Sequence, residues 1–223
     1  ARRAAGVSLG GTVRAGRVEF APFLDWVDLD IAEPLGARLG VPVTVENDVI
    51  ALTEAEHWFG RARGIPGFSL ITIGAGVGHG LVVDGRVVRT AAGTDLVGHV
   101  PVAASGPVCS RGHRGCAQML TTALVRTGDP AAAEIAEALG NLIALVAGLT
   151  QQSVVVLSGE GIGLIAGAED RMRSAIASAR DPLADPVDVR IDDSGFSAWA
   201  RGAAAIAIQA AVDRIDLNAV ATV

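Results

Sequence analysis

The stretch 131–161, AAAEIAEALGNLIALVAGLTQQSVVVLSGEG, contains the pattern that decides the fold. Apolar side chains recur every three or four positions across 131–150, and this spacing predicts a helix. The valine-rich run 153–158 follows at once and predicts a buried strand that ends in a glycine turn. A second helix is expected from about 163 to 179. Helix, strand, glycine turn and helix in succession predict an α/β architecture with parallel strands.

The rest of the chain repeats this alternation of strands and helices. A helix is expected to begin at Asn47 or Asp48, because both residue types are preferred helix caps. A long helix is expected over 197–215, and Asp84 with Gly85 is typical of a hairpin turn. Short apolar runs bounded by turn residues predict further strands at 42–45, 69–73, 80–83 and 187–191.

Composition narrows the class of protein. The 223 residues are 50% hydrophobic, which is enough for a sizeable core in one large domain or two lobes. The net charge of −6 argues against a nucleic-acid-binding surface, which normally shows basic patches. Two cysteines are too few for a disulfide framework. The sequence contains no long uncharged apolar run and no signal-peptide core, so we expect a cytoplasmic protein without a membrane partner.

Four segments, in this order and spacing, resemble the ROK family of repressors, open reading frames and sugar kinases. They are VENDVIALTEAEHWFG (45–60), IGAGVGHGLVVDGRVV (73–88), GHVPVAASGPVCSRGHRGC (98–116) and VVVLSGEG (154–161). The resemblance runs from about Gly6 to Ile215. It implies an α/β, actin-like (ribonuclease H-like) two-lobed sugar kinase fold. The ending SAWARGAAAIAIQ and the GEG turn look most like the family's transcriptional regulators from high-GC bacteria.

The segment SLGGT (8–12) resembles the Asp-x-Gly-x-Thr phosphate turn of actin-like kinases, but Ser8 stands where the aspartate is needed. It also lies too close to 45–48 for the family's first phosphate turn. We therefore interpret residues 6–13 as a later strand and turn of the small lobe. The small lobe is then expected to be incomplete, with residues missing before Ala1.

The resemblance implies a division of the chain into three parts. Residues 1–46 are expected to be a remnant of the small lobe, and residues 47–203 the large lobe with the sugar site and a degenerate zinc loop. Residues 204–223 are expected to form a terminal helix that returns to the small lobe. The segment near 123–127 looks shorter than its family counterpart, so residues are expected to be missing there too.

Asn47 and Asp48 are the first candidate site residues. By resemblance both bind sugar hydroxyls, and in a kinase Asp48 would be the catalytic base that takes the proton from the attacking hydroxyl. From the residue types alone, a helix cap is the alternative reading. Ile50 stands where the kinases usually have a further asparagine.

His99 and Gln118 are the other implied sugar contacts. Gln118 stands where the family often has a glutamate, and it keeps hydrogen-bonding capacity without the charge. Leu96 occupies another glutamate position and cannot accept a hydrogen bond, although the adjacent Asp95 can substitute from a shifted backbone.

The segment GAGVGHG (74–80) corresponds to the family's second phosphate turn. Ala75 lacks the hydroxyl that kinases usually offer here, and His79 adds bulk where a glycine is common. A tight hairpin turn that needs positive φ is the alternative reading. If a nucleotide binds, the residues that approach its phosphates are Gly74, Gly76 and Gly78.

The family's zinc site uses one histidine and three cysteines, and this chain supplies His99, Cys109 and Cys116. Arg111 replaces the third cysteine and cannot coordinate a metal. His113 is close in sequence, but its position in the turn normally faces away from the metal. We therefore expect zinc at low occupancy, with free thiols or a disulfide as the alternative.

The sequence favours the sugar-sensing and oligomerisation part of a ROK-type transcriptional regulator, without kinase activity. Its ligand would be a sugar or sugar derivative, and DNA would be bound only through a helix-turn-helix upstream of this chain. The alternative is an ATP-dependent sugar kinase that uses ATP and Mg²⁺ in hexokinase-like phosphoryl transfer, and a degenerate fragment without a ligand is the third reading. The helix 131–150 is apolar over most of its circumference, so we expect a homodimer or tetramer.

Overall fold

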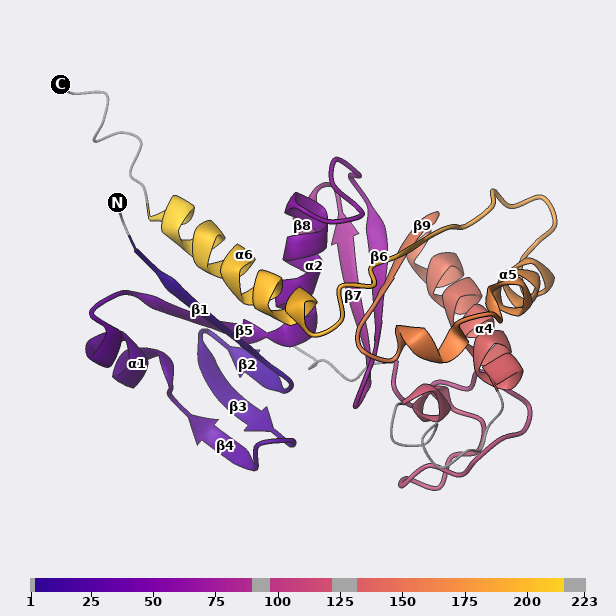
Figure 1. The fold of residues 1–223 in the computed structure, drawn as a ribbon, viewed down its shortest axis with the longest axis horizontal. Helices are drawn as coiled ribbons and strands as arrows, with labels where there is room; N and C mark the ends of the chain where they lie inside the picture. The colour runs from indigo at the N-terminus through magenta and orange to yellow at the C-terminus, as the bar shows by residue number, and fades with distance from the viewer. Residues whose placement is uncertain (1–2, 90–96, 122–131, 215–223) are drawn as a thin grey trace.

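The computed structural model describes residues 3–89, 97–121 and 132–214. Figure 1 shows two halves, with a small group of strands on one side and a larger sheet with its own helices on the other. Between them lie α2 (Asp48–Trp58) and α6 (Ser197–Asp213).

The larger half is built on a five-stranded mixed sheet. Its central strand pairs in parallel with one neighbour and antiparallel with the other. Of the two strands at the edges of the sheet, one pairs in parallel with its neighbour and the other pairs antiparallel. In sheet order the strands are β10 (Asp188–Ile191), β9 (Val154–Ser158), β6 (Phe68–Ile73), β7 (Val77–Val83) and β8 (Arg86–Val87).

Both faces of this sheet are covered by helices. Every residue of β6 is buried, and alternate side chains enter different cores because successive residues of a strand point to opposite faces. Phe68 and Leu70 pack with residues of α2 and α6. Ile71 and Ile73 pack with residues of α4 (Ala132–Thr150) and α5 (Glu169–Ser178). The predicted α/β architecture is therefore present.

The smaller half contains a parallel pair and a three-stranded antiparallel sheet. The pair is β1 (Ala5–Leu9) with β5 (Val43–Asn47). The antiparallel strands are β2 (Thr12–Arg14), β3 (Arg17–Ala21) and β4 (Trp26–Leu29), and α1 (Ala32–Leu39) lies between β4 and β5 in the chain. A small separate core, which includes Leu9, Val18 and Val45, holds this half together.

Helix α6 packs closely against β1 and α2, and two glycines allow this approach. A side-chain carbon at Gly6 would overlap the backbone of Ala203. A side-chain carbon at Gly202 would lie 2.9 Å from the backbone nitrogen of Leu52. The terminal helix therefore contacts strands of the smaller half, while the lobe boundaries after residues 46 and 203 stay a prediction.

A buried cluster of charges also joins α6 to α2. Arg201 donates to Glu56 Oε1 at 3.1 Å and to Asp192 Oδ2 at 2.7 Å. Ser158 at the end of β9 also donates to Asp192. Burial raises the pKa of Glu56. For Asp192 burial acts in the same direction, but hydrogen bonds from Ser194 and the charge of Arg201 outweigh it and lower its pKa.

Two element predictions need correction. The helix expected from 163 to 179 is broken into a 3-10 turn at Ile162–Ile165 and the shorter helix α5. Gly167 between them has a φ of 79°, which a continuous right-handed helix does not allow. The strand expected at 80–83 begins earlier, at Val77, because the glycine-rich residues there pair with the end of β6.

Helix α4 is the one helix in the described ranges that is long and apolar enough to cross a membrane. Most of its apolar side chains, including Ile135, Leu139 and Ile143, are packed in the larger core. Leu145 and Leu149 are exceptions, with 39% and 77% of their surface exposed. The helix is therefore a core helix with an apolar edge left open, rather than one buried all round.

Candidate functional site

Asn47 and Asp48 lie where β5 ends and α2 begins. The side chain of Asn47 caps the helix, because its Oδ1 accepts a hydrogen bond from the backbone N–H of Ile50 at 3.0 Å. Its Nδ2 donates to the carbonyl of Gly11 and to Asp48 Oδ1. The capping role is therefore present at Asn47, and most of its amide is used within the protein.

Asp48 is half-buried at the first turn of α2. Its Oδ1 accepts from the backbone N–H of Val49 at 2.8 Å, while its Oδ2 lies beside Gly10 in the small half. Burial raises the pKa of Asp48, and the negative charge of Glu160 raises it further, against the hydrogen bonds that lower it. A carboxylate with a raised pKa, whose Oδ2 takes part in neither of the hydrogen bonds to Oδ1, is suited to accept a hydrogen bond or a proton.

The glycine turn between β6 and β7 does not use positive φ at Gly74, Gly76 or Gly78, so this part of the hairpin reading is wrong. Gly78 is needed because a side chain there would overlap Val49 of α2. Gly76 has open space where a side chain would be. In this turn, Gly78 is therefore required by close packing against α2, whereas the space beside the backbone of Gly76 is open.

His79 does not line this turn, contrary to the expectation that it adds bulk there. It lies on β7 opposite Ile71, and its Nε2 is 3.2 Å from Ser69 Oγ. Burial lowers the pKa of His79, which favours the neutral ring. His79 belongs to a different cavity, on the side of the molecule lined by Arg14, Glu46 and Arg89.

Glu160 is a site residue that the sequence did not single out. It stands in the glycine turn after β9, and its carboxylate lies against Gly74. The GEG motif was visible in the sequence, but only the fold brings it to the other glycine turn and within electrostatic reach of Asp48. Two carboxylates therefore share this end of the cleft.

These residues border one cleft between the two halves, with a volume of about 820 Å³. Four of the residues predicted to bind sugar line it, namely Asn47, Asp48, His99 and Gln118. The phosphate-turn glycines, Glu160 and Arg111 line it as well. Asp95 and Leu96 lie outside the described residues. The structure thus brings the predicted site residues together, and their roles toward a ligand stay a prediction.

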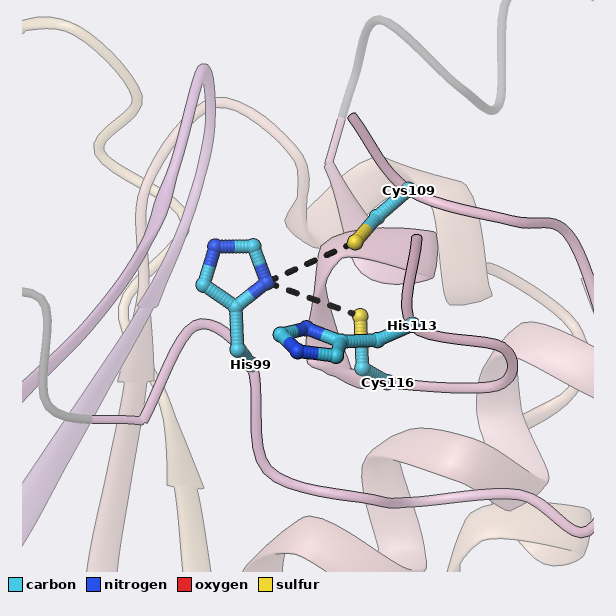
Figure 2. Close-up of side chains that lie close together, drawn as sticks. All are labelled: His99, Cys109, His113 and Cys116. Carbon is cyan, nitrogen blue, oxygen red and sulfur yellow. Dashed lines mark hydrogen bonds between the residues drawn. The ribbon is translucent and has the colours of Figure 1, made fainter. Parts of the chain in front are cut away.

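His99, Cys109 and Cys116 form a cluster at one edge of this cleft (Figure 2). The Nδ1 atom of His99 lies 3.6 Å from Cys109 Sγ and 3.9 Å from Cys116 Sγ. Both cysteines are buried and free. Histidine nitrogen and cysteine sulfur are the donor types of structural zinc sites, so these residues suit the metal that the resemblance implies.

His113 does not face away from this cluster, which corrects the sequence-based expectation. Its ring meets that of His99 edge to face, with 4.9 Å between the ring centroids. One ligand atom from each of His99, Cys109, His113 and Cys116 lies within 4.8 Å of the others. Arg111 is exposed at the tip of the turn and lines the cleft, so it occupies no place in the cluster.

The backbone around Cys109 favours its thiolate. Burial disfavours the charged form, but the N–H groups of Arg111, His113 and Gly112 hydrogen-bond to the sulfur, and on balance the pKa of Cys109 is lowered. Burial and the neighbouring Cys109 raise the pKa of Cys116. Because the two pKa values are shifted in opposite directions, the sulfur of Cys109 ionises before that of Cys116.

Comparison with known proteins links this cleft to a family. The sequence profile of the ROK family matches residues 1–127. The glucokinase of Thermotoga maritima is 39% identical over 111 residues, which cover 48% of this chain and 35% of that protein. The xylose repressor of Bacillus subtilis is 31% identical over 101 residues, which cover 45% of this chain and 26% of that protein. The match covers between about a quarter and a third of the length of these curated relatives.

Solved structures show the same fold. A ROK family glucokinase from Streptomyces griseus, in complex with glucose and AMPPNP, has a TM-score of 0.74 at 24% identity, over 92% of this chain and 81% of that chain. A ROK family transcriptional regulator, a homologue of the E. coli MLC protein, has a TM-score of 0.73 at 23% identity, over 92% of this chain and 62% of that chain. The fold is the α/β, actin-like fold of sugar kinases, and with its profile match over more than half of its length this chain belongs to the ROK family.

Proposed function

We propose that this chain is the sugar-sensing and oligomerisation part of a ROK-type transcriptional regulator and that it does not phosphorylate its sugar. The observation that carries the proposal is the position of Glu160, whose carboxylate lies against Gly74 in the cleft that Asp48 also lines. A nucleotide phosphate at the glycine turn would add further negative charge beside two carboxylates. Phosphoryl transfer depends on neutralising such charge, so this arrangement disfavours it.

The glycine turn supports the same proposal. Ala75 has no hydroxyl to offer a phosphate, and the sequence Gly-Glu-Gly after β9 makes the neighbouring turn acidic. A neutral sugar is not repelled by Glu160, because its hydroxyl groups donate hydrogen bonds to carboxylates. The relatives of this chain include a xylose repressor as well as glucokinases, which is compatible with a regulator.

The expected ligand is a sugar or sugar derivative, which would lie between α2 and the loop that carries His99. Asp48 Oδ2 is the carboxylate oxygen that is turned toward the small half, and it can accept a hydroxyl hydrogen bond. His99 directs Nδ1 at the thiols, which leaves Nε2 for the cleft. The Gln118 amide both donates and accepts. Asn47 would contribute mainly by fixing Asp48 through its Nδ2.

Assembly and DNA binding complete the proposal. DNA would be bound through a helix-turn-helix upstream of this chain, and the protein would act in the cytoplasm as a homodimer or tetramer. A symmetric dimer presents two DNA-binding heads at a fixed spacing, which operators with two half-sites need. The exposed Leu145 and Leu149 of α4 offer an apolar surface for such contacts.

Calorimetric titration of the full-length protein with pentoses, hexoses and N-acetylhexosamines tests the proposal. We expect at least one sugar to bind and to change operator affinity at a fixed salt concentration, and we expect Asp48→Ala to weaken that binding. Leu183→Ala is the matched control, because Leu183 is 95% exposed and is not one of the residues that line the cleft. Absence of sugar binding across the panel, or equal binding by both variants, would contradict the proposal.

The alternative function is an ATP-dependent sugar kinase with Asp48 as base. The observation in its favour is the raised pKa of Asp48, since burial tunes a carboxylate toward general-base chemistry. Gly74, Gly76 and Gly78 would then approach the phosphates, and Mg²⁺ would offset the charges of Asp48 and Glu160. Sugar-dependent ADP release that requires Asp48 separates this function from the regulator.

A further inference from the structure

We infer that His113 is the fourth ligand of a zinc site that it forms with His99, Cys109 and Cys116. A tetrahedral zinc ion with Zn–S of about 2.3 Å and Zn–N of about 2.0–2.1 Å separates sulfur and nitrogen ligands by about 3.6 Å. The two separations from His99 Nδ1 to the thiol sulfurs, 3.6 Å and 3.9 Å, are close to this value. The ligand atoms of all four residues lie within 4.8 Å of one another, as four ligands of one ion must.

The backbone explains why residue 113 reaches the metal and residue 111 does not. The N–H of Gly112 donates to the carbonyl of Cys109, which closes a tight turn with Arg111 near its tip. The chain then returns antiparallel, so that the N–H of Cys109 donates to the carbonyl of His113 at 2.9 Å. Residues opposite each other in an antiparallel pair place their side chains on the same face. Figure 2 accordingly shows the His113 ring beside the two thiols.

The ligand set favours a metal over a disulfide between the two cysteines. His99 Nδ1 is placed at nearly the same distance from both sulfurs, and the His113 ring packs against the His99 ring. A disulfide would use the sulfurs and would give neither His99 Nδ1 nor the His113 ring a role in the cluster. Two imidazoles with two thiolates give a closed four-coordinate set, which is the pattern of structural zinc.

This site would stabilise one wall of the cleft. Ser110 and Arg111 in the ligand-bearing turn line the cleft, and Gln118 follows Cys116 after one residue. The inference does not depend on the proposed function, because a zinc-anchored wall serves a sensor and a kinase equally. We therefore expect zinc close to full occupancy, in place of the low occupancy that three ligands predict.

Zinc content and affinity of the full-length protein, purified under reducing conditions, test the inference. Wild type should retain close to one zinc per chain after dialysis. His113→Ala should weaken zinc binding in a chelator competition by at least about 10–100-fold, since even indirect partners of a zinc site cost that much. His113→Cys should restore binding, because a thiolate is also a zinc ligand. Arg111→Ala, in the same turn, is the control and should bind as tightly as wild type.

X-ray absorption of the zinc-loaded wild type gives a readout that needs no variant. We expect two sulfur and two imidazole ligands. A count of two sulfurs, one imidazole and one oxygen would overturn the inference, and so would equal zinc affinity of wild type and His113→Ala. Reduced wild type with two titratable thiols and no affinity for added zinc would overturn it as well.

Discussion

Replacing Arg201 by methionine should strongly destabilise the fold. The guanidinium of Arg201 pairs with Glu56 and Asp192, whose side chains are 0% and 4% exposed. Removing one partner of a buried ion pair typically costs about 3–5 kcal/mol, because the remaining charge stays buried without its partner. The Arg201 side chain is itself 41% exposed, so water reaches part of the vacated site. We therefore expect a loss of about 3 kcal/mol in the free energy of unfolding at pH 7.

The loss should depend on pH in a definite direction. Without Arg201 the folded-state pKa values of Glu56 and Asp192 must rise, because a nearby positive charge that favours their ionised forms is removed. A carboxyl group whose pKa is higher in the folded than in the unfolded protein lowers the free energy of unfolding at any pH above its unfolded-state pKa. This loss disappears at lower pH, where the group is protonated in both the folded and the unfolded protein. The difference between wild type and Arg201→Met should therefore shrink as the pH falls from 7 toward about 4.

Urea unfolding of both proteins at pH 7 and at pH 5 measures this effect. Arg171→Met is the matched control, because Arg171 and Glu137 form an exposed ion pair with side chains 60% and 47% exposed. Exposed pairs contribute about 0–1 kcal/mol, so the control should lose little at either pH. A loss for Arg201→Met no larger than that of the control would refute the reasoning. A loss that grows as the pH falls would refute it equally.

Further predictions concern packing and the cleft carboxylate. Gly202→Ala should cost about 1–3 kcal/mol in urea unfolding, because the new carbon would press on the backbone of Leu52, whereas Gly148→Ala in α4, which has open space, should be neutral or stabilising by up to about 1 kcal/mol. Equal effects of these two substitutions would show that α6 does not pack as described. Asp48→Asn should raise the unfolding temperature at pH 7, because the raised folded pKa of Asp48 costs stability above its ordinary value. That gain should fade as the pH approaches about 4, and a gain that persists there would argue against the buried charge as its cause.

The elements that the sequence predicted well are those with strong local signals. Helix α4 has a long apolar period, β9 has a run of valines, and the junction at Asn47 joins a strand to a residue type that caps helices. These signals act over a few residues and do not depend on the partner that each element packs against. The break at Gly167 was missed because an isolated glycine is tolerated inside helices, and only the observed φ shows that this one ends a turn.

The site residues that belong to sequence motifs could be predicted from the sequence. Those that depend on contacts between distant segments could not. The motifs pointed to Asp48 and His99, which line one cleft, and to Cys109, which lies in the cluster with His99, while the roles of these residues toward a ligand stay a prediction. Glu160 was missed as a neighbour of Gly74 because the two turns meet only through the parallel pairing of β6 with β9. His113 was placed wrongly because the direction of a side chain after a turn follows from the hydrogen-bond register, which the residue types do not specify.

The claim that this cleft holds a sugar without phosphorylating it is tested most directly by ADP release. The full-length protein would be assayed with Mg²⁺ and ATP across pentoses, hexoses and N-acetylhexosamines, with Asp48→Asn measured alongside. We expect no sugar-dependent ADP release from either protein, because the Glu160 carboxylate lies against Gly74, in the glycine turn that would have to hold the phosphates. Sugar-dependent ADP release by the wild type that Asp48→Asn abolishes would contradict the account.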